Sequence, residues 1–98
     1  MVDGTYDVRI RIPLLGAQKA VAQLTTEGEE LRVQVEHEGR TESTVGTATG
    51  KRFRFSGQLD VPTGSLSCDI EGEITPDGLL KGRCRTNVGT FRITGTRR

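Results

Sequence analysis

Residues 66–84 read LSCDIEGEITPDGLLKGRC, and this stretch decides the fold class. From 66 to 74 the even positions hold apolar or small residues and the odd positions hold charged or hydroxyl-bearing ones; the same alternation returns from 80 to 84. A period of two is typical of strands with one buried face. The TPDG sequence at 75–78 is the strongest turn signal in the chain. We therefore expect two antiparallel strands joined by a tight turn.

The same alternation, broken by turns rich in glycine and proline, runs through the rest of the chain. It predicts eight short strands at intervals of about 10–12 residues, a spacing typical of sequential β-hairpins. The predicted strands are 6–12, 20–24, 31–37, 41–49, 53–61, 66–74, 80–85 and 91–96. The weakest of them is 41–49, which is rich in Thr and Ser and is expected to lie at a sheet edge.

These strands predict an all-β fold. Eight meandering strands with one apolar face can close on themselves and so remove both sheet edges. Gly57, Gly72, Gly82 and Gly95 fall at inward positions, where glycine is typical of the bends in a tightly curved sheet. We predict a small, flattened, eight-stranded antiparallel up-and-down barrel. An open two-sheet sandwich is the alternative.

The second half of the chain resembles the first. Pro13 recurs as Pro62 and Gly46 as Gly95, both at a spacing of 49 residues. Self-similarity at a fixed period indicates one supersecondary unit used twice. We predict a single domain over 1–98, with half-repeats of about 4–50 and 51–98 and an approximate internal twofold axis. Only 33% of the residues are hydrophobic and 4% aromatic, so the two halves are expected to share one core.

The positions of the turn glycines carry a family resemblance. They are Pro13 and Gly16, the DGLLKG sequence at 77–82, and the GTF and GTR sequences at 89–91 and 95–97. With these motifs the chain resembles small bacterial calycin-like β-barrel domains built from two copies of such a pattern. The first copy departs from the pattern at Gly28, which follows Glu instead of Asp. The resemblance implies a barrel of the kind that often binds small apolar molecules, and it implies no enzymatic activity.

Charge and hydropathy limit which partners and which cellular compartment are expected. With 14 basic and 13 acidic residues the formal charge is +1, which gives no electrostatic footprint for nucleic acid or an anionic membrane. No apolar run approaches the ~18 residues that a membrane-spanning helix needs. The start of the sequence has neither the basic nor the apolar region of a signal peptide, so a cytoplasmic location is expected.

His37 is the only histidine, so any Ser-His or Cys-His catalytic apparatus would depend on it. It lies in phase with the inward residues of its strand. One interpretation is a strand-end histidine bonded to a neighbouring carbonyl; the other is a polar group at a pocket mouth, together with Tyr6. Zinc needs about four ligands in tight spacing, which one His with Cys68 and Cys84 does not supply. We expect no catalysis, no metal and no cofactor.

The two cysteines and the arginines each allow two interpretations. Cys68 and Cys84 are both in the inward phase and flank the turn at 75–78, so they are either buried thiols or a disulfide or redox pair. The arginines are Arg52, Arg54, Arg83, Arg85, Arg92, Arg97 and Arg98. Since the strand at 66–74 carries acidic residues outward, a cross-strand ladder of alternating charge is the first interpretation. An RNA- or phosphate-binding surface is the second.

Two leucines at a hairpin tip complete the candidate site. Leu14 and Leu15 either fold back to plug one end of the barrel or contact a partner or ligand. The leading hypothesis is a non-catalytic binding module that holds a small apolar molecule or docks on a protein partner, through Tyr6, Leu14, Leu15 and His37. The alternatives are an oligomerisation or accessory subunit that pairs through 41–49, which includes a homo-oligomer, and an enzyme inhibitor.

Overall fold

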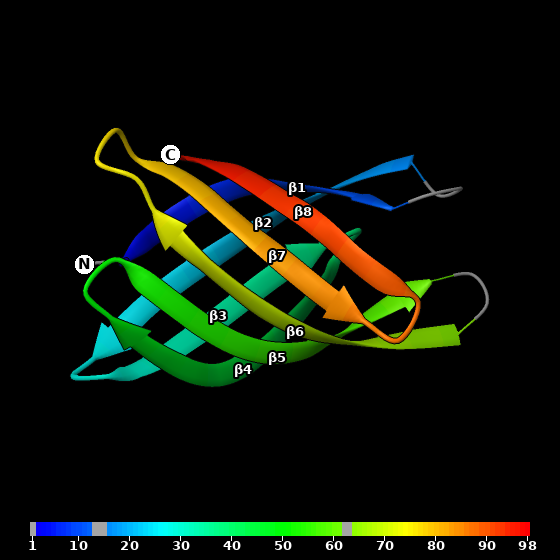
Figure 1. Ribbon diagram of the computed structural model, residues 1–98, viewed down its shortest axis with the longest axis horizontal. Coiled ribbons are helices and arrows are strands. Elements are labelled where there is room, and N and C mark those ends of the chain that lie inside the picture. Colours follow the sequence, from blue (N-terminus) through cyan, green and yellow to red (C-terminus); the bar gives the residue numbers. More distant parts are fainter. Residues whose placement is uncertain (1, 13–15, 62–63) are drawn as a thin grey trace.

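The chain forms eight antiparallel strands in a computed structural model that describes residues 2–12, 16–61 and 64–98, with backbone alone for 59–61 and 65–66. Figure 1 shows the strands wound around a common interior. They are β1 (Gly4–Ile12), β2 (Gly16–Glu27), β3 (Glu30–His37), β4 (Arg40–Thr49), β5 (Arg52–Val61), β6 (Gly64–Ile74), β7 (Leu79–Thr86) and β8 (Gly89–Arg97). No helix in the described part of the chain is long and apolar enough to cross a membrane.

The sheet closes into a barrel in which each strand pairs with its neighbours in sequence and β8 pairs with β1. The predicted eight-stranded antiparallel barrel is therefore confirmed, and the two-sheet sandwich is wrong. The expectation that 41–49 forms an edge holds for its first part alone, because β4 pairs with β3 from Arg40 to Thr47 but with β5 only from Gly46 to Thr49. Closure gives the end of this polar segment two strand partners, which its weak hydrophobic pattern does not reveal.

The boundaries of the strands differ most from prediction in β2. The sequence pattern predicts a strand at 20–24, but the strand extends from Gly16 to Glu27. Its first residues pair with β1 as far as Ile12, and its last residues pair with β3 as far as Glu30. Backbone pairing on both sides thus extends the strand into segments that have no alternation of their own.

The two ends of the barrel are closed differently. Figure 1 shows both chain termini at one end, which we call the terminal end. There Val2 and Tyr6 are 0% exposed, and the Tyr6 hydroxyl donates a hydrogen bond to the Val2 carbonyl at 2.8 Å. The segment before β1 therefore fills the terminal end of the core. Several inward residues nearer the opposite end, including Ile10, Val35 and Ile70, are only partly buried.

A close approach of backbones supports the curvature of the sheet. Gly72 of β6 pairs with Gly82 of β7, and a Cβ atom at Gly72 would lie 2.5 Å from the Lys81 carbonyl oxygen. The same Cβ would lie 2.8 Å from the ring of Phe53, so the missing side chain is what admits that ring to the core. Glycine is required here for space and not for its φ angle.

Candidate functional site

The pairing between β4 and β5 is the shortest in the barrel. It covers four residue pairs, from Gly46 opposite Phe55 to Thr49 opposite Arg52, whereas β5 and β6 share ten pairs. We call this pairing the internal seam. Beyond Gly46 the two strands separate, and Figure 1 shows them diverging from their common turn. The first half of β4 therefore lacks a strand partner on its β5 side.

Gly46 stands at the point where the strands separate. A Cβ atom there would lie 2.0 Å from the Arg54 carbonyl oxygen and 2.7 Å from the Cβ of Phe55. Contacts this short do not occur between real side chains, so only glycine lets the two backbones approach so closely here. Residue 46 thus fixes where the internal seam begins to open.

The register of β4 determines where its free backbone groups point. The amide of Ala48 donates to the carbonyl of Glu29, on the side of β3. Because the direction of backbone groups alternates along an antiparallel strand, the groups of Thr41, Ser43 and Val45 point toward β5. Among the described residues no β5 partner pairs with these three positions. The Val45 side chain is 62% exposed.

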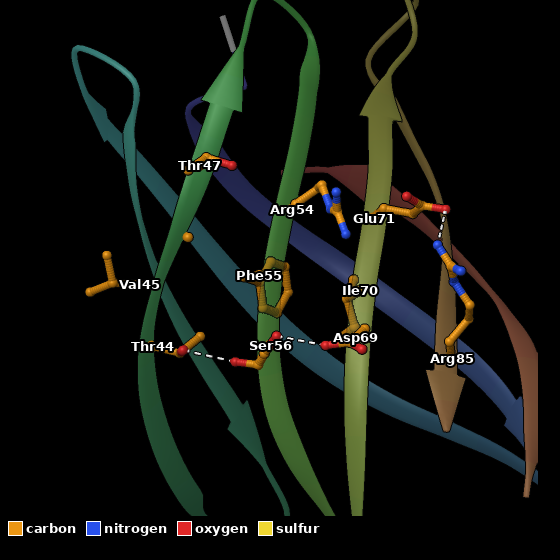
Figure 2. Close-up of a pocket in the computed structure, with 11 residues that line it drawn as sticks. Thr44, Val45, Thr47, Arg54, Phe55, Ser56, Asp69, Ile70, Glu71 and Arg85 are labelled. Carbon is orange, nitrogen blue, oxygen red and sulfur yellow. Dashed lines mark hydrogen bonds and ion pairs between the residues drawn. The ribbon is translucent and has the colours of Figure 1, made fainter. Parts of the chain in front are cut away.

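A groove of about 240 Å³ lies over the opened seam. Phe55 and Ile70, which belong to the inward faces of their strands, line it and are only half-buried. Figure 2 shows these two side chains side by side between the polar residues of the rim. The Phe53 and Phe55 rings stack at a centroid distance of 6.1 Å, which continues the apolar surface into the core. The separation of β4 from β5 is thus where core side chains become reachable from outside.

Hydrogen bonds hold one side of the rim in place. The Thr44 hydroxyl donates to the Ser56 carbonyl at 2.8 Å, and the Ser56 hydroxyl donates to Asp69 Oδ1 at 2.7 Å. These bonds link β4, β5 and β6 across the groove, as Figure 2 shows. A side chain of β4 thereby takes the place of the missing backbone pairing at this level.

Arg54 supplies a cation that no acidic side chain neutralises. It lies opposite Glu71 in the register of β5 and β6. Glu71, however, forms its ion pair with Arg85, at 3.1 Å between Oε1 and Nη2. In the described part of the chain Arg54 has no ion pair or hydrogen bond of its side chain. Its guanidinium is therefore available to an anion at the edge of the apolar groove.

Tyr6 lies on β1, and His37 lies two strands away as the last residue of β3. Tyr6 pairs with Ala22, which pairs with Val35, so the register places His37 two residues further along β3 than the level of Tyr6. Neither lines the groove. The pocket end predicted from these residues stays a prediction. The inward phase of both residues is correctly predicted, but phase says nothing of position along the strand.

Both aromatic side chains have their polar atoms bonded within the protein. The Tyr6 hydroxyl, besides donating to Val2, accepts a bond from Arg97 Nη2 at 2.7 Å. His37 Nδ1 lies 2.8 Å from the Lys19 carbonyl, so Nδ1 carries the proton and donates. The His37 side chain is 26% exposed. This is the geometry of a strand-end histidine bonded to a neighbouring carbonyl.

The remaining candidates separate into two groups. Leu14 and Leu15 lie outside the described residues, so their role stays a prediction. Cys68 and Cys84 are buried thiols that are not joined as a disulfide, and Cys84 pairs with Ile70, two positions from Cys68. A hydrogen bond with Cys68, and then burial, raise the pKa of the Cys84 thiol. A thiol held protonated in this way is a poor nucleophile.

The chemistry of the groove is that of binding. No three His, Cys, Asp or Glu side chains gather as a metal site within the described ranges. The groove offers an apolar floor, hydroxyl groups from Thr44 and Ser56, and the unpaired cation of Arg54. Its rim also holds the Asp69 carboxylate, which accepts from Ser56, and the ion pair of Glu71 with Arg85. Sequence reasoning missed it because Phe55 and Ile70 read as ordinary core positions. The available signal was the weak, hydroxyl-rich pattern of 41–49, which marks the strand that separates.

Comparisons with known proteins support the fold alone. No protein-family model matches the chain, and no curated protein matches it either. The chain is similar to a solved structure of a redesigned beta barrel, with 16% identity and a TM-score of 0.68. The match covers 99% of this chain and 91% of that chain. At this identity the similarity shows that both chains are β-barrels and nothing of function.

Proposed function

We propose that this protein is a non-catalytic binding module that holds a small molecule in the groove over the internal seam. The ligand has an apolar body and one anionic group. The observation that carries the proposal is the unpaired guanidinium of Arg54 beside the half-buried Phe55 and Ile70. Such a combination of apolar floor and one fixed charge is typical of small-molecule sites.

The size of the groove supports a compact ligand. Ligand pockets for drug-sized molecules occupy about 300–1,000 Å³, so a groove of about 240 Å³ suits a small molecule of two or three rings. Phe55 and Ile70 would bury its apolar face, and Arg54 would bind a carboxylate or sulfonate in two-point contact. The resemblance to calycin-like domains, which often hold small apolar molecules, is consistent with this proposal. The proposed site lies on the wall of the barrel and not at its end.

The binding proposal is tested with 8-anilinonaphthalene-1-sulfonate, whose rings and sulfonate match the groove and whose fluorescence rises on apolar burial. We expect saturable binding that Arg54→Gln weakens by about tenfold or more, since a charge-assisted bond of about 1.5–3 kcal/mol is lost. Arg52→Gln is the matched control, because Arg52 is exposed on the same strand face but does not line the groove. Equal binding by the parent protein and both variants would refute the assignment.

A homo-oligomer is the second candidate, and the unpaired backbone groups of Thr41, Ser43 and Val45 favour it. A strand edge with free amides and carbonyls is a template for pairing with another chain. This candidate predicts a concentration-dependent mass by light scattering, which Val45→Lys reduces to that of a monomer. A constant monomer mass from micromolar to millimolar concentration would exclude it. The inhibitor hypothesis stays a prediction, since its loop at 13–16 falls largely outside the described residues.

A further inference from the structure

Four neighbouring strands on the side of the barrel opposite β4 carry a surface of basic side chains. Its members are exposed, point outward and come from β1, β2, β7 and β8: Arg9, Arg11, Lys19, Lys81, Arg83 and Arg92. β8 lies between β7 and β1, so these strands form one continuous surface. Within the described ranges none of the six side chains has an ion pair. We call this surface the cationic face.

The register places like charges directly opposite each other on this face. Arg83 of β7 pairs with Arg92 of β8, and Arg9 of β1 pairs with Lys19 of β2. Directly opposed like charges destabilise a sheet, whereas opposite charges stabilise it. The contrast with the neighbouring strands is clear, since β5 and β6 pair Arg52 with Glu73. Strand β7 belongs to both arrangements, since Lys81 and Arg83 oppose Glu73 and Glu71 of β6 on their other side. The predicted ladder of alternating charge therefore ends at β7, and the like-charge pairs begin between β7 and β8.

A broad hollow lies within the cationic face. It has a volume of about 810 Å³, and its lining includes Arg9, Lys19 and Lys81 together with Thr94 and Thr96. Thr94 pairs with both Lys81 and Arg9, so the row from β7 to β2 reads cation, hydroxyl, cation, cation. Three carboxylates also line the hollow: Asp7, which pairs with Arg98 at 3.0 Å, and Glu36 and Glu38 at its β3 side. The cations of the hollow therefore lie on its β7, β1 and β2 strands, and the two glutamates border it beyond β2.

We propose that the cationic face binds the phosphate backbone of a nucleic-acid duplex. The backbone positions that carry these cations are spaced about 4.8 Å apart on neighbouring strands and about 6.7 Å apart two residues along one strand, so the cations form a two-dimensional field that suits closely spaced phosphates. Arginine binds phosphate in two-point contact, and threonine hydroxyls donate to phosphate oxygens. Four of the six cations are arginines. Affinity of this kind is independent of base sequence.

The chemistry of the face favours a duplex over other anionic partners. Single-strand binding relies on exposed aromatic rings, but Tyr6, Phe53 and Phe91 are buried and Phe55 is inward. Protein interfaces rely on large apolar or aromatic anchors, and membrane docking on inserted ones. The exposed large hydrophobic residues in the described ranges are Val45 and Val88, and neither belongs to these rows. A surface of charge and hydroxyls alone suits a duplex backbone.

The formal charge of +1 hides this surface because it averages over the whole chain. Glu27, Glu29 and Glu30 stand together around the turn between β2 and β3, outside the cationic face. A cluster of one sign raises the local concentration of counter-ions of the other sign, whatever the total charge. The expectation of no nucleic-acid partner rests on that total, and the register gives a reason to revise it.

The test is fluorescence anisotropy of labelled 20-base-pair DNA and RNA duplexes at 50 and 200 mM salt. We expect dissociation constants of about 1–100 µM that rise steeply with salt. The double variant Arg83→Gln/Arg92→Gln is expected to weaken binding by roughly tenfold and to lower the salt slope by about 2. The matched control is Lys51→Gln/Arg52→Gln, which removes two exposed cations outside the face. It is expected to leave binding within about twofold of the parent protein.

Thermal unfolding of the same double variant gives an independent readout. The change removes one unfavourable cross-strand pair, Arg83 with Arg92, and one favourable pair, Arg83 with Glu71. The melting temperature is therefore expected to stay within about 2 °C of the parent protein, so loss of folding does not account for lost binding. The proposal is overturned if no duplex binds at 50 mM salt, or if the control variant loses as much affinity as the double variant. Binding to phosphatidylserine vesicles or to poly-glutamate, with none to the duplexes, overturns it as well.

Discussion

The barrel closes at two seams that are held in different ways. The internal seam joins β4 to β5 through four residue pairs and a short turn at 50–51, and then opens into the groove. The terminal seam joins β1 to β8 through five pairs, from Tyr6 opposite Arg97 to Ile10 opposite Ile93. No turn connects β8 to β1, since they are the two ends of the chain. The two seams therefore need different means of closure.

Side chains reinforce the terminal seam. Arg97 Nη2 donates to the Asp3 carbonyl at 2.9 Å and to the Tyr6 hydroxyl, and its guanidinium lies 5.4 Å from the centre of the Tyr6 ring. Arg98 donates its amide to the Thr5 carbonyl and pairs with Asp7. At the internal seam the covalent turn already limits separation. The comparison indicates that the internal seam is free to open because its turn replaces these bonds.

The largest expected effect comes from adding a side chain at Gly46, where the backbones of β4 and β5 approach closely at the internal seam. Gly46→Ala places a Cβ 2.0 Å from the Arg54 carbonyl, so the backbones of β4 and β5 must separate. We expect a loss of about 2–3 kcal/mol in the free energy of unfolding, as for overpacked cores. Urea denaturation measures it.

Gly57→Ala is the matched control for that change. Gly57 is also an inward glycine of the barrel, but its added Cβ would meet nothing within 4 Å and its φ angle is not positive. We expect its stability to stay within about 0.5 kcal/mol of the parent protein. If both variants unfold at the same urea concentration, the internal seam is not fixed by close approach at Gly46.

At the terminal seam, Tyr6→Phe removes one hydroxyl and two hydrogen bonds. The Val2 carbonyl is left without its buried donor, and Arg97 keeps its bond to Asp3. We expect a loss of about 1–2 kcal/mol in the free energy of unfolding. Hydrogen exchange should localise the change, with faster exchange of the Arg98 amide, which donates across this seam to Thr5. Unchanged exchange at Arg98 would contradict the reinforcement by Tyr6.

How far the sequence predicts these features depends on the kind of contact. Alternation predicts the inward phase of Phe55 and Ile70, because phase depends only on neighbours along the strand. It cannot predict that the two are reachable from outside, since that depends on where β4 leaves β5. That point is set by Gly46, whose tight contact with Arg54 joins residues of different strands.

The cationic face depends on register in the same way. The sequence shows Arg83 and Arg92, but not that they stand opposite each other. Likewise, the sequence shows that Cys68 and Cys84 flank one turn, but not that they are offset by two residues in the pairing of β6 with β7. The phase of Tyr6 predicts that it lies at a pocket mouth, but it does not predict the contact with Arg97, which comes from barrel closure. The fold class thus follows from local pattern, and the candidate sites follow from pairings that the pattern leaves open.

The N-terminal segment gives the terminal seam a dependence on acid. The hydroxyl and amide of Thr26 donate to the Asp3 carboxylate and hold its pKa below the ordinary value of 3.8. Because the pKa is lower in the folded state, this stabilisation is complete above the unfolded pKa and is lost as the pH falls through the folded one. We expect the urea concentration at the midpoint of unfolding to decrease as the pH falls below 3.8, and to decrease less in Asp3→Asn.

Asp77→Asn is the control for this acid dependence. The Thr75 hydroxyl likewise lowers the pKa of Asp77, but that carboxylate lies in the turn between β6 and β7 and takes no part in the seam. Both variants should flatten the acid limb of the stability curve. Only Asp3→Asn should also speed the exchange of the Thr26 amide, which donates a hydrogen bond to the Asp3 carboxylate. Equal exchange of the Thr26 amide in the two variants would mean that Asp3 does not contribute to the closure of the terminal end.

The smallest effect is expected from Thr44→Val at the internal seam, and it gives the most direct comparison with Tyr6→Phe. Each change removes one hydroxyl that donates at 2.8 Å to a backbone carbonyl. The Tyr6 bond is buried, whereas the Thr44 bond to Ser56 is exposed, so water can replace the lost donor there. We expect Thr44→Val to change the free energy of unfolding by less than about 0.5 kcal/mol. A loss as large as that of Tyr6→Phe would mean that the internal seam, too, is held by its side chains, and the groove would then be a fixed part of the wall instead of the place where the barrel opens.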